Sequence, residues 1–358
     1  MAKDDDEDLA PLPRENPDLE GHAAAEAQLL EAWRSGRLPH GWLFTGPQGI
    51  GKATLAYRFA RFVLAGGGDG GGLFGDAPAD LRLDPAHPVF RRVAAGGHSD
   101  LMFLERSKTV IKVEEVREAG AFLSLTPGEG AWRVVVVDSA DDLNTASANA
   151  LLKVLEEPPD RALLILVSHA PGGLPATIRS RCCRLPLHPL PDDAVRTLLA
   201  RWRPALPAED AAALARLGEG SIGRALRLAD GGGLGLYRQM IELIAPLPRL
   251  DVAGVHAFAD KLARTGADAT FDTAMDLLAW WVARLVRAGA DPAAGLPGGE
   301  VVAGEGEAAR RLAACGTLER WVDVWEKIGR QVAQADALNL DRRQVVLGAF
   351  QAMEDSAR

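Results

Sequence analysis

Residues 46–54 have the types and spacing of a phosphate-binding loop, with one departure. The segment reads GPQGIGKAT and matches G-x-x-x-x-G-K from Gly46 to Lys52. In such a loop, backbone N–H groups and the lysine hold phosphates, and a Ser or Thr after the lysine ligates Mg²⁺. Here that position is Ala53. Thr54 follows one residue later, and on a helix it is rotated by about 100° from position 53, so it does not face the same ion.

A second candidate for nucleotide chemistry is the carboxylate of Asp138. It ends the continuous β-branched run RVVVVD at residues 133–138, which is typical of a central parallel strand buried on both faces. An Asp at the carboxyl edge of a parallel sheet is where a P-loop protein holds Mg²⁺. Both the loop and this carboxylate would need a parallel sheet to bring them together.

The segments around the loop have the pattern that such a site needs. The run GWLFTG at residues 41–46 predicts a strand, and residues 52–64 have apolar residues at helical spacing. Strand, glycine turn and helix is the order in which backbone N–H groups meet phosphate. The alternative is a glycine-rich turn that only connects a strand to a helix.

Strand and helix patterns continue to alternate as far as residue 188. Short strands are expected at residues 100–106 and 109–113, an amphipathic helix at 113–125, and a buried strand at 163–169. Between them, a helix should begin at the N-cap Asn144 and end before Pro158 and Pro159. This alternation predicts an α/β domain with a mostly parallel sheet. The glycine-rich stretch 66–80 is expected to be a surface loop.

The chain after residue 188 has helical patterns and no convincing strand. Residues 192–230 give three short helices, and a glycine run at 231–233 separates these from longer ones at 271–290 and 318–336. Each long helix has an apolar stripe that is expected to pack in a core or, alternatively, to serve a subunit interface. The stripes contain Met275, Leu278, Trp281, Val282 and Leu285 in the first helix, and Trp321, Trp325, Ile328 and Val332 in the second.

Composition places the chain among ordinary globular proteins. It has 358 residues, 47% of them apolar, and a net charge of −9, which does not favour strong DNA binding by this chain alone. No apolar run is long enough to span a membrane and no signal-peptide pattern is present, so we expect a cytoplasmic protein. The three cysteines, Cys182, Cys183 and Cys315, lack the spacing of a zinc site.

Three further motifs point to a family. The segments NALLKVLEEPP at 149–159, TIRSRC at 177–182 and GSIGRAL at 220–226 closely resemble those of bacterial DNA polymerase III clamp-loader subunits. These are AAA+ proteins that open a ring-shaped sliding clamp and place it on primed DNA. The opening segment 13–47 looks most like that of delta-prime-type members. The resemblance covers roughly residues 13–230 by motif, and the remainder only by helical character.

The resemblance implies a fold and a division into domains. A disordered acidic tail at residues 1–12 would precede an AAA+ P-loop α/β domain at 13–188, with a mostly parallel sheet and flanking helices. A small helical lid at 189–232 and an all-α collar at 233–358, through which subunits oligomerise, would follow.

Departures from the family pattern bear on whether the chain hydrolyses ATP. In members that do, the residue after the strand-terminal Asp is a glutamate that orients the attacking water. Here it is Ser139, which cannot act as that base. Together with Ala53, this predicts a non-hydrolysing subunit. The alternative is an active clamp-loader-type ATPase that tolerates Ala53 and recruits Asp141. A P-loop small-molecule kinase is disfavoured by the three motifs and the long helical tail.

The resemblance also assigns roles to residues. Arg181 would project into a neighbouring subunit's ATP site, a role suited to its rigid, always charged donor fork. Arg224 matches the position from which the lid touches nucleotide, and Ser168 matches a sensor position in the sheet. The degenerate nucleotide site would comprise Gly46, Gly49, Gly51, Lys52, Asp138 and Arg224. Lys153 and the EEPP turn after it are expected to be structural or interfacial.

Cofactors and partners follow from the same resemblance. No cofactor is required, although ATP or ADP could bind without hydrolysis. No zinc is expected, because the family's cysteine-rich hairpin is absent from 65–100 and His87 and His98 alone are too few. The expected partners are the gamma/tau-type ATPase and delta-type subunits of the loader. The sliding clamp and primer-template DNA would be reached through the complex, and no membrane is involved.

Overall fold

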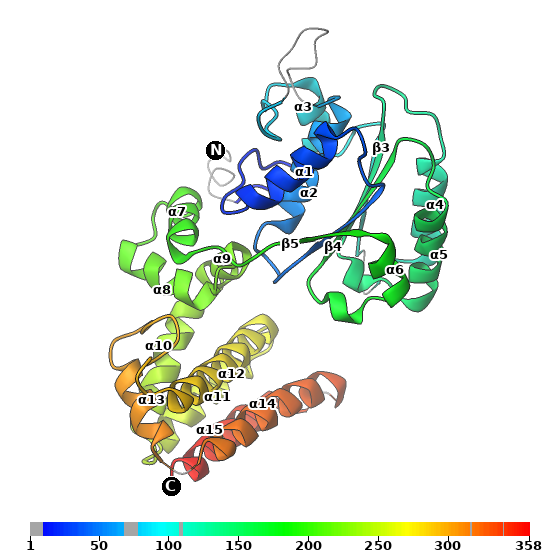
Figure 1. The fold of residues 1–358 in the computed structure, drawn as a ribbon. Helices are drawn as coiled ribbons and strands as arrows, with labels where there is room; N and C mark the ends of the chain where they lie inside the picture. The colour runs from blue at the N-terminus through cyan, green and yellow to red at the C-terminus, as the bar shows by residue number, and fades with distance from the viewer. Residues whose placement is uncertain (1–9, 68–77, 107–109, 316, 339) are drawn as a thin grey trace, which may run out of the picture. The chain divides into compact units, whose positions relative to one another are not determined.

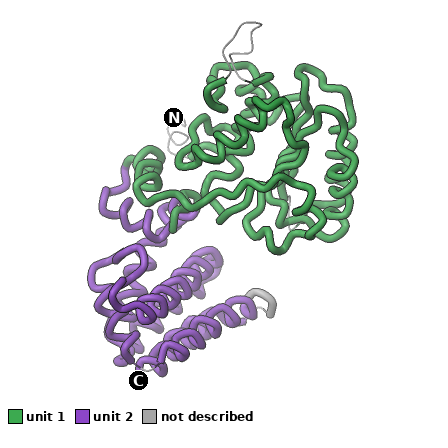
Figure 2. The backbone as a smooth tube through the Cα atoms, in the orientation of Figure 1, with its two compact units in different colours: residues 1–204, 219–223 green, residues 205–218, 224–358 purple. Residues whose placement is uncertain are grey.

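The computed structural model describes residues 10–67, 78–106, 110–315, 317–338 and 340–358. The chain forms two compact units, one of residues 1–204 and 219–223 and one of residues 205–218 and 224–358 (Figure 2). The predicted acidic tail lies mostly outside the described residues, as does most of the predicted loop at 66–80. The predicted domain bounds at 13–188, 189–232 and 233–358 stay a prediction.

The first unit contains five strands, seven α-helices and two short 3₁₀ turns among its described residues (Figure 1). In chain order these are α1 (Ala23–Arg34), β1 (Gly41–Thr45), α2 (Lys52–Leu64), α3 (Pro88–Ala94), β2 (Leu101–Glu105), α4 (Val113–Leu123), β3 (Arg133–Asp138), η1 (Ala140–Asp142), α5 (Thr145–Glu156), β4 (Ala162–Ser168), η2 (Pro171–Gly173), α6 (Ala176–Arg181), β5 (Cys183–Pro186) and α7 (Asp192–Trp202).

All five strands pair in parallel, in the order β2-β3-β4-β1-β5. Thr45 at the end of β1 is in register with Ser168 at the end of β4, and Asp138 at the end of β3 pairs with Val167. The carboxyl ends of the three central strands therefore meet at one edge, where the glycine loop also begins. The predicted α/β fold with a parallel sheet, followed only by helices in the part of the chain that the structure describes, is confirmed.

The sheet is buried on both faces because successive side chains point to opposite sides. Helices α1, α2 and α3 cover one face, and α4, α5 and α6 cover the other (Figure 1). The first face carries Trp42, Phe44, Val134, Val136, Leu163, Ile165 and Val167. The second face carries Leu43, Val135, Val137, Leu164 and Leu166. Continuous apolar strands are what this two-sided burial requires.

One predicted strand does not form. The segment 109–113 was expected to be extended, but in its described part Ile111 makes only an isolated parallel bridge to Leu143. Helix α4 begins directly afterwards at Val113, because Glu115 accepts a hydrogen bond from the backbone N–H of Lys112 and so caps its first turn. The helix predicted from Asn144 is present, and the Asn144 side chain caps it by accepting from the N–H of Ser147 at 2.9 Å.

Among its described residues, the second unit contains helices joined by turns and loops, and no strand. It contains α8 (Ala208–Gly218), α9 (Ile222–Asp230, whose first two residues belong to the first unit), α10 (Gly233–Ile244), α11 (Val252–Leu262), α12 (Asp268–Ala290), α13 (Glu305–Ala313), α14 (Leu318–Leu338) and α15 (Arg342–Ser356). Helix α12 packs against α10, α13 and α14, and α15 packs against α11 and α14. No helix in the described part of the chain combines the length and apolar character that crossing a bilayer requires.

The two apolar stripes differ in their burial. Every predicted stripe residue of α12 is buried. In α14, Trp321 and Ile328 are buried, but Trp325 is 47% exposed and its neighbour on the helix surface, Val322, is 39% exposed. Trp325 therefore does not belong to the core of this chain, and the interface alternative applies to it.

Candidate functional site

The glycine loop connects β1 to α2, and its glycines are required by close packing. Gly46 and Gly49 have positive φ of 147° and 76°, which favour glycine. A Cβ on Gly49 would lie 2.5 Å from Ser221 Oγ, and one on Gly46 would overlap the carbonyl oxygen of Leu187. Gly51, with φ of 104°, is the N-cap of α2. These glycines therefore have a packing reason that is independent of phosphate.

Each carbonyl of the loop accepts a hydrogen bond from within the chain. The bonds are Lys52 Nζ to Gly46 O at 2.7 Å and to Pro47 O at 2.5 Å, Ser221 Oγ to Gln48 O at 2.7 Å, Gly223 N to Gly49 O at 2.9 Å, His22 Nε2 to Ile50 O at 2.6 Å, and Leu55 N to Gly51 O at 3.0 Å. The loop is thus held by hydrogen bonds from α2, from the GSIGRAL segment and from His22.

Lys52 is only 3% exposed, and its ammonium group is held by carbonyls of its own loop. Burial lowers the pKa of Lys52 to about 8, against the attraction of Asp138 and Asp141, which raises it. The ammonium group thus lies at the carboxyl edge of the sheet within the field of both carboxylates, which is where the sequence predicted it.

Asp138 ends β3 opposite Glu105, which ends β2. Burial and the charge of Glu105 raise the pKa of Asp138 to about 6, while Lys52 acts in the opposite direction. Asp138 stands at the strand end where a P-loop protein holds Mg²⁺, but position 53 contributes no hydroxyl as a further ligand.

Asp141 does not lie free to orient a water molecule. Its carboxylate accepts hydrogen bonds from Ser139 Oγ and Ser168 Oγ, each at 2.8 Å. It also accepts from the backbone N–H groups of His169 and Ala170. Burial raises the pKa of Asp141, but these hydrogen bonds outweigh it and lower the pKa overall. Ser168, the predicted sensor residue, is thereby committed to Asp141.

A small cavity lies beside the loop, among the N-terminal segment, α7 and the start of α9. Its volume is about 30 Å³. Small-molecule sites typically have about 300–1,000 Å³. The cavity is lined by Asn16, Asp18, Leu19, Glu20, Ile50, Gly51, Thr54, Leu190, Leu198, Trp202 and Ile222.

The N-terminal segment is tied down by two arginines of α2. The guanidinium group of Arg61, 2% exposed, donates to the carbonyls of Arg14 and Asn16 at 3.0 and 2.8 Å. Arg58 donates to the carbonyl of Pro17 at 2.8 Å. Sequence analysis missed this arrangement, as it missed His22, because backbone carbonyls receive the bonds and leave no pattern in the residue types.

Arg181 ends α6 in a setting unlike that of Lys52. Its side chain is 37% exposed, and its guanidinium group pairs with Glu156 of α5 at 2.8 Å and donates to the Thr177 carbonyl at 3.2 Å. An ion pair this exposed contributes about 0–1 kcal/mol, so it can exchange for another anion at little cost.

Arg224 lies in the second unit, near Asp276 of α12. Burial raises the pKa of Asp276, while the charges of Arg224 and Arg227 lower it. The structure therefore places Arg224 beside a carboxylate of its own unit. Its predicted contact with nucleotide stays a prediction.

The histidines predicted to be loop residues have local roles. His87 caps α3 by accepting from the N–H of Val89 at 3.2 Å, and His98 accepts from the N–H of Asp100 at 3.1 Å. Over the described ranges, no group of three or more His, Cys, Asp or Glu is placed to hold a metal ion. Burial raises the pKa of the Cys182 thiol to about 12, which makes it unreactive.

Comparison with known proteins points to the same family as the sequence motifs. Residues 21–191 match the family model described as DNA polymerase III, delta subunit. The chain is 36% identical over 217 residues to the DNA polymerase III subunit delta' of Pseudomonas aeruginosa, covering 60% of this chain and 63% of that protein. It is 31% identical over 258 residues to the gamma/tau subunit of Mycobacterium tuberculosis, covering 70% and 43%.

These matches span less than two thirds of the length of either relative. Among solved structures, a DNA polymerase III gamma subunit-related protein of Thermotoga maritima aligns with 92% of this chain and 100% of its own, at 16% identity and a TM-score of 0.46.

Proposed function

We propose that this chain is a non-hydrolysing delta-prime-type subunit of a clamp loader. Its residues 21–191 match the family model described as DNA polymerase III, delta subunit. In this role it helps to load the sliding clamp onto primer-template DNA and supplies Arg181 to a neighbouring ATP site. The match to the family model and the identity to delta' and gamma/tau subunits support the first part. The geometry of the two charged sites supports the second.

The observation that carries the non-hydrolysing assignment is the environment of Asp141. An active ATPase would need a carboxylate to orient water in place of the missing glutamate, and Asp141 is the nearest candidate after Ser139. Its carboxylate accepts from two side chains and two backbone N–H groups. Using Asp141 as a base would therefore break the turn that follows β4. This argues against the active-ATPase alternative.

No nucleotide is required for the loop to keep its shape in this proposal. Lys52 already donates to two of the loop carbonyls, and the other loop carbonyls accept hydrogen bonds from elsewhere in the chain. ATP or ADP that reaches the loop N–H groups would be held without turnover, because Ala53 supplies no Mg²⁺ ligand.

Arg181 is the group that this subunit offers to the complex. A guanidinium fork matches the charge that develops on a transferring phosphoryl group, and an arginine of this kind contributes about 10³–10⁵ in rate. The exposure of Arg181 and its single half-exposed carboxylate partner leave it available to a neighbour. The proposed neighbour is a gamma/tau-type ATPase.

The second unit is proposed to join the subunits. Helix α14 presents Trp325 and Val322 to solvent, and aromatic residues are enriched in the centres of interfaces. We assign its helices from about residue 233 onward to a collar that contacts the gamma/tau-type and delta-type subunits. The assembled protein would work in the cytoplasm.

The test of the hydrolysis assignment is ATP turnover by the purified chain, alone and with clamp and primed DNA. We expect no activity above background. Turnover of about 1 s⁻¹, the low end of productive phosphoryl transfer, would contradict the proposal if Lys52→Ala abolished it. Loss of that turnover in the variant is needed to exclude a contaminating ATPase.

A further inference from the structure

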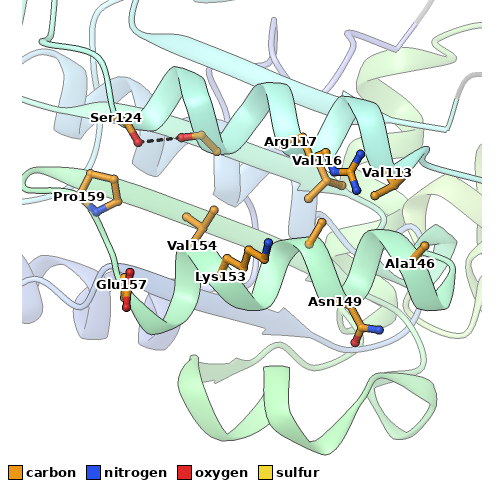
Figure 3. Close-up of a pocket in the computed structure, with 12 residues that line it drawn as sticks. Val113, Val116, Arg117, Ser124, Ala146, Asn149, Lys153, Val154, Glu157 and Pro159 are labelled. Carbon is orange, nitrogen blue, oxygen red and sulfur yellow. Dashed lines mark hydrogen bonds between the residues drawn. The ribbon is translucent and has the colours of Figure 1, made fainter.

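A groove runs between α4 and α5, on the face of the sheet opposite α1 and α2. Its volume is about 520 Å³, within the range of about 300–1,000 Å³ that binding sites have. Figure 3 shows the groove with the side chains that line it. They are Val113, Val116, Arg117, Gly120 and Ser124 of α4 and its end, and Ala146, Asn149, Ala150, Lys153, Val154, Glu157 and Pro159 of α5 and the turn after it.

The floor of the groove is apolar and made of small residues. Val116 is 1% exposed, and Ala150 and Val154 are half-buried. Gly120 lets the two helices approach, since a Cβ there would lie 3.1 Å from Val154 Cγ2. Because Gly120 and Ala150 have little or no side chain, the space between the helices stays open and lined by hydrocarbon.

Two cations stand on the rim, one from each helix. Arg117 and Lys153 are both exposed, and within the described ranges neither side chain has an ion-pair or hydrogen-bond partner. Figure 3 shows the only lining carboxylate, Glu157, beside Pro159 at the end of the groove away from Val113. The groove is therefore net positive on a chain whose net charge is −9.

We propose that this groove binds a short peptide segment of a partner protein that combines apolar and acidic residues. An apolar side chain of the segment lies on Val116, Ala150 and Val154, and its carboxylates pair with Arg117 and Lys153. An arginine and a lysine held over hydrocarbon complement such a segment in both respects, since apolar burial gives affinity and the charges give orientation.

A nucleic acid is a poorer match to the same surface. Phosphate backbones are bound by rows of cations that neutralise successive charges, and affinity grows with the number neutralised. The groove offers two cations above an apolar floor, and no aromatic residue on which a base could stack. DNA is therefore an alternative outcome of the test.

The test measures fluorescence anisotropy of short labelled probes with the full chain. The probes are a peptide that alternates Asp with Leu and Phe, the same peptide with Ala for its Leu and Phe, the same peptide with Lys for its Asp, and a single-stranded oligonucleotide. We expect binding of the first peptide only. Arg117→Glu/Lys153→Glu should weaken that binding at least tenfold, which corresponds to about 1.4 kcal/mol.

A charge swap separates recognition from a folding defect. The doubly reversed variant should gain binding of the Lys-containing peptide, which a misfolded protein would not do. Arg37→Glu, a reversal of an exposed cation outside the groove, is the matched control and should bind like the parent. The proposal is overturned if the acidic peptide does not bind or binds the reversed variant equally well. It is also overturned if the oligonucleotide binds with the same dependence on Arg117 and Lys153.

Discussion

The sheet edge around Lys52 and the end of helix α6 differ in how firmly the chain holds its charged groups. Lys52 is 3% exposed and donates to two carbonyls of its own loop, whereas Arg181 is 37% exposed and pairs with one half-exposed carboxylate. In the first arrangement the ammonium group bonds to carbonyls of the same loop. The second can exchange its partner at small cost. The difference shows that the hydrogen-bonding capacity of Lys52 is used within its own loop, while Arg181 remains accessible to a group outside the chain.

The largest expected effect comes from substituting Arg181, the exposed member of this comparison. In a reconstituted loader, Arg181→Ala should reduce hydrolysis at the neighbouring site by about 10³–10⁵, because the transferring phosphoryl group loses a donor fork. Total ATPase activity should fall partially, and clamp loading onto primed DNA should fall further if every site must act. Arg181→Lys should rescue poorly, since a point charge does not reproduce the fork.

Two controls accompany that measurement. Arg184→Ala removes an exposed arginine of β5 close in sequence and should leave loading unchanged. Assembly of the Arg181→Ala complex should also be normal in size-exclusion chromatography, because an exposed residue rarely determines a fold. Equal loading rates with wild-type and Arg181→Ala subunits would show that Arg181 has only its structural pairing with Glu156.

The packing of the glycine loop around Lys52 is tested at Gly49. A Cβ there meets Ser221 Oγ at 2.5 Å with φ at 76°, so Gly49→Ala should lower the free energy of unfolding by about 2–5 kcal/mol through overpacking and left-handed strain. Gly36→Ala is the matched control, because its φ is 67° but nothing lies within 4 Å of the added atom. It should cost about 1 kcal/mol from strain alone. Equal losses of unfolding free energy for the two variants, measured by urea unfolding, would mean that the packing against Ser221 does not constrain position 49.

The exposed tryptophan extends the comparison to the second unit. Trp325→Ala should weaken assembly with the other subunits by about 2 kcal/mol or more, the usual cost of truncating a central interface aromatic. Monomer stability should change little, because the side chain is 47% exposed. Co-elution with partner subunits and thermal melting of the isolated chain are the two readouts. Lys327→Ala, at an exposed position of the same helix, is the control. Unchanged affinity would remove Trp325 from the interface.

The smallest expected effect is a pH dependence at Asp138. Its pKa is raised to about 6 in the folded chain from 3.8, so the folded state binds the proton more tightly than the unfolded state. The resulting stability is fully present below about pH 4 and is lost as pH rises through 6. Asp138→Asn has no such dependence. Its free energy of unfolding, relative to that of wild type, should therefore rise by about 1–3 kcal/mol between pH 4 and 7. Parallel stability curves for the two proteins over this range would contradict the raised pKa.

Local patterns in the sequence determined most of the strands and helices, and they are the basis of the prediction that the nucleotide site does not hydrolyse ATP. The run RVVVVD predicted a buried parallel strand, and Asn144 predicted the start of a helix, because strand burial and helix capping depend on neighbouring residues. Ala53 and Ser139 stand where a hydroxyl and a carboxylate are needed for hydrolysis, and no packing can restore groups that the chain does not contain. The strand expected at 109–113 failed because capping of α4 takes over at Lys112.

Tertiary structure alone decided which groups meet. Ser221 reaches the Gln48 carbonyl across 173 residues, and His22 reaches that of Ile50 across 28, and no periodicity encodes either pair. The apolar stripe of α14 also could not be resolved from the sequence. Trp321 and Trp325 both fit its helical spacing, but Trp321 is buried and Trp325 is exposed. Spacing says which residues share a helix face, but only the packed neighbours determine how much of that face is covered. The groove under Arg117 and Lys153 likewise exists only because α4 and α5 pack side by side with Gly120 and Ala150 between them.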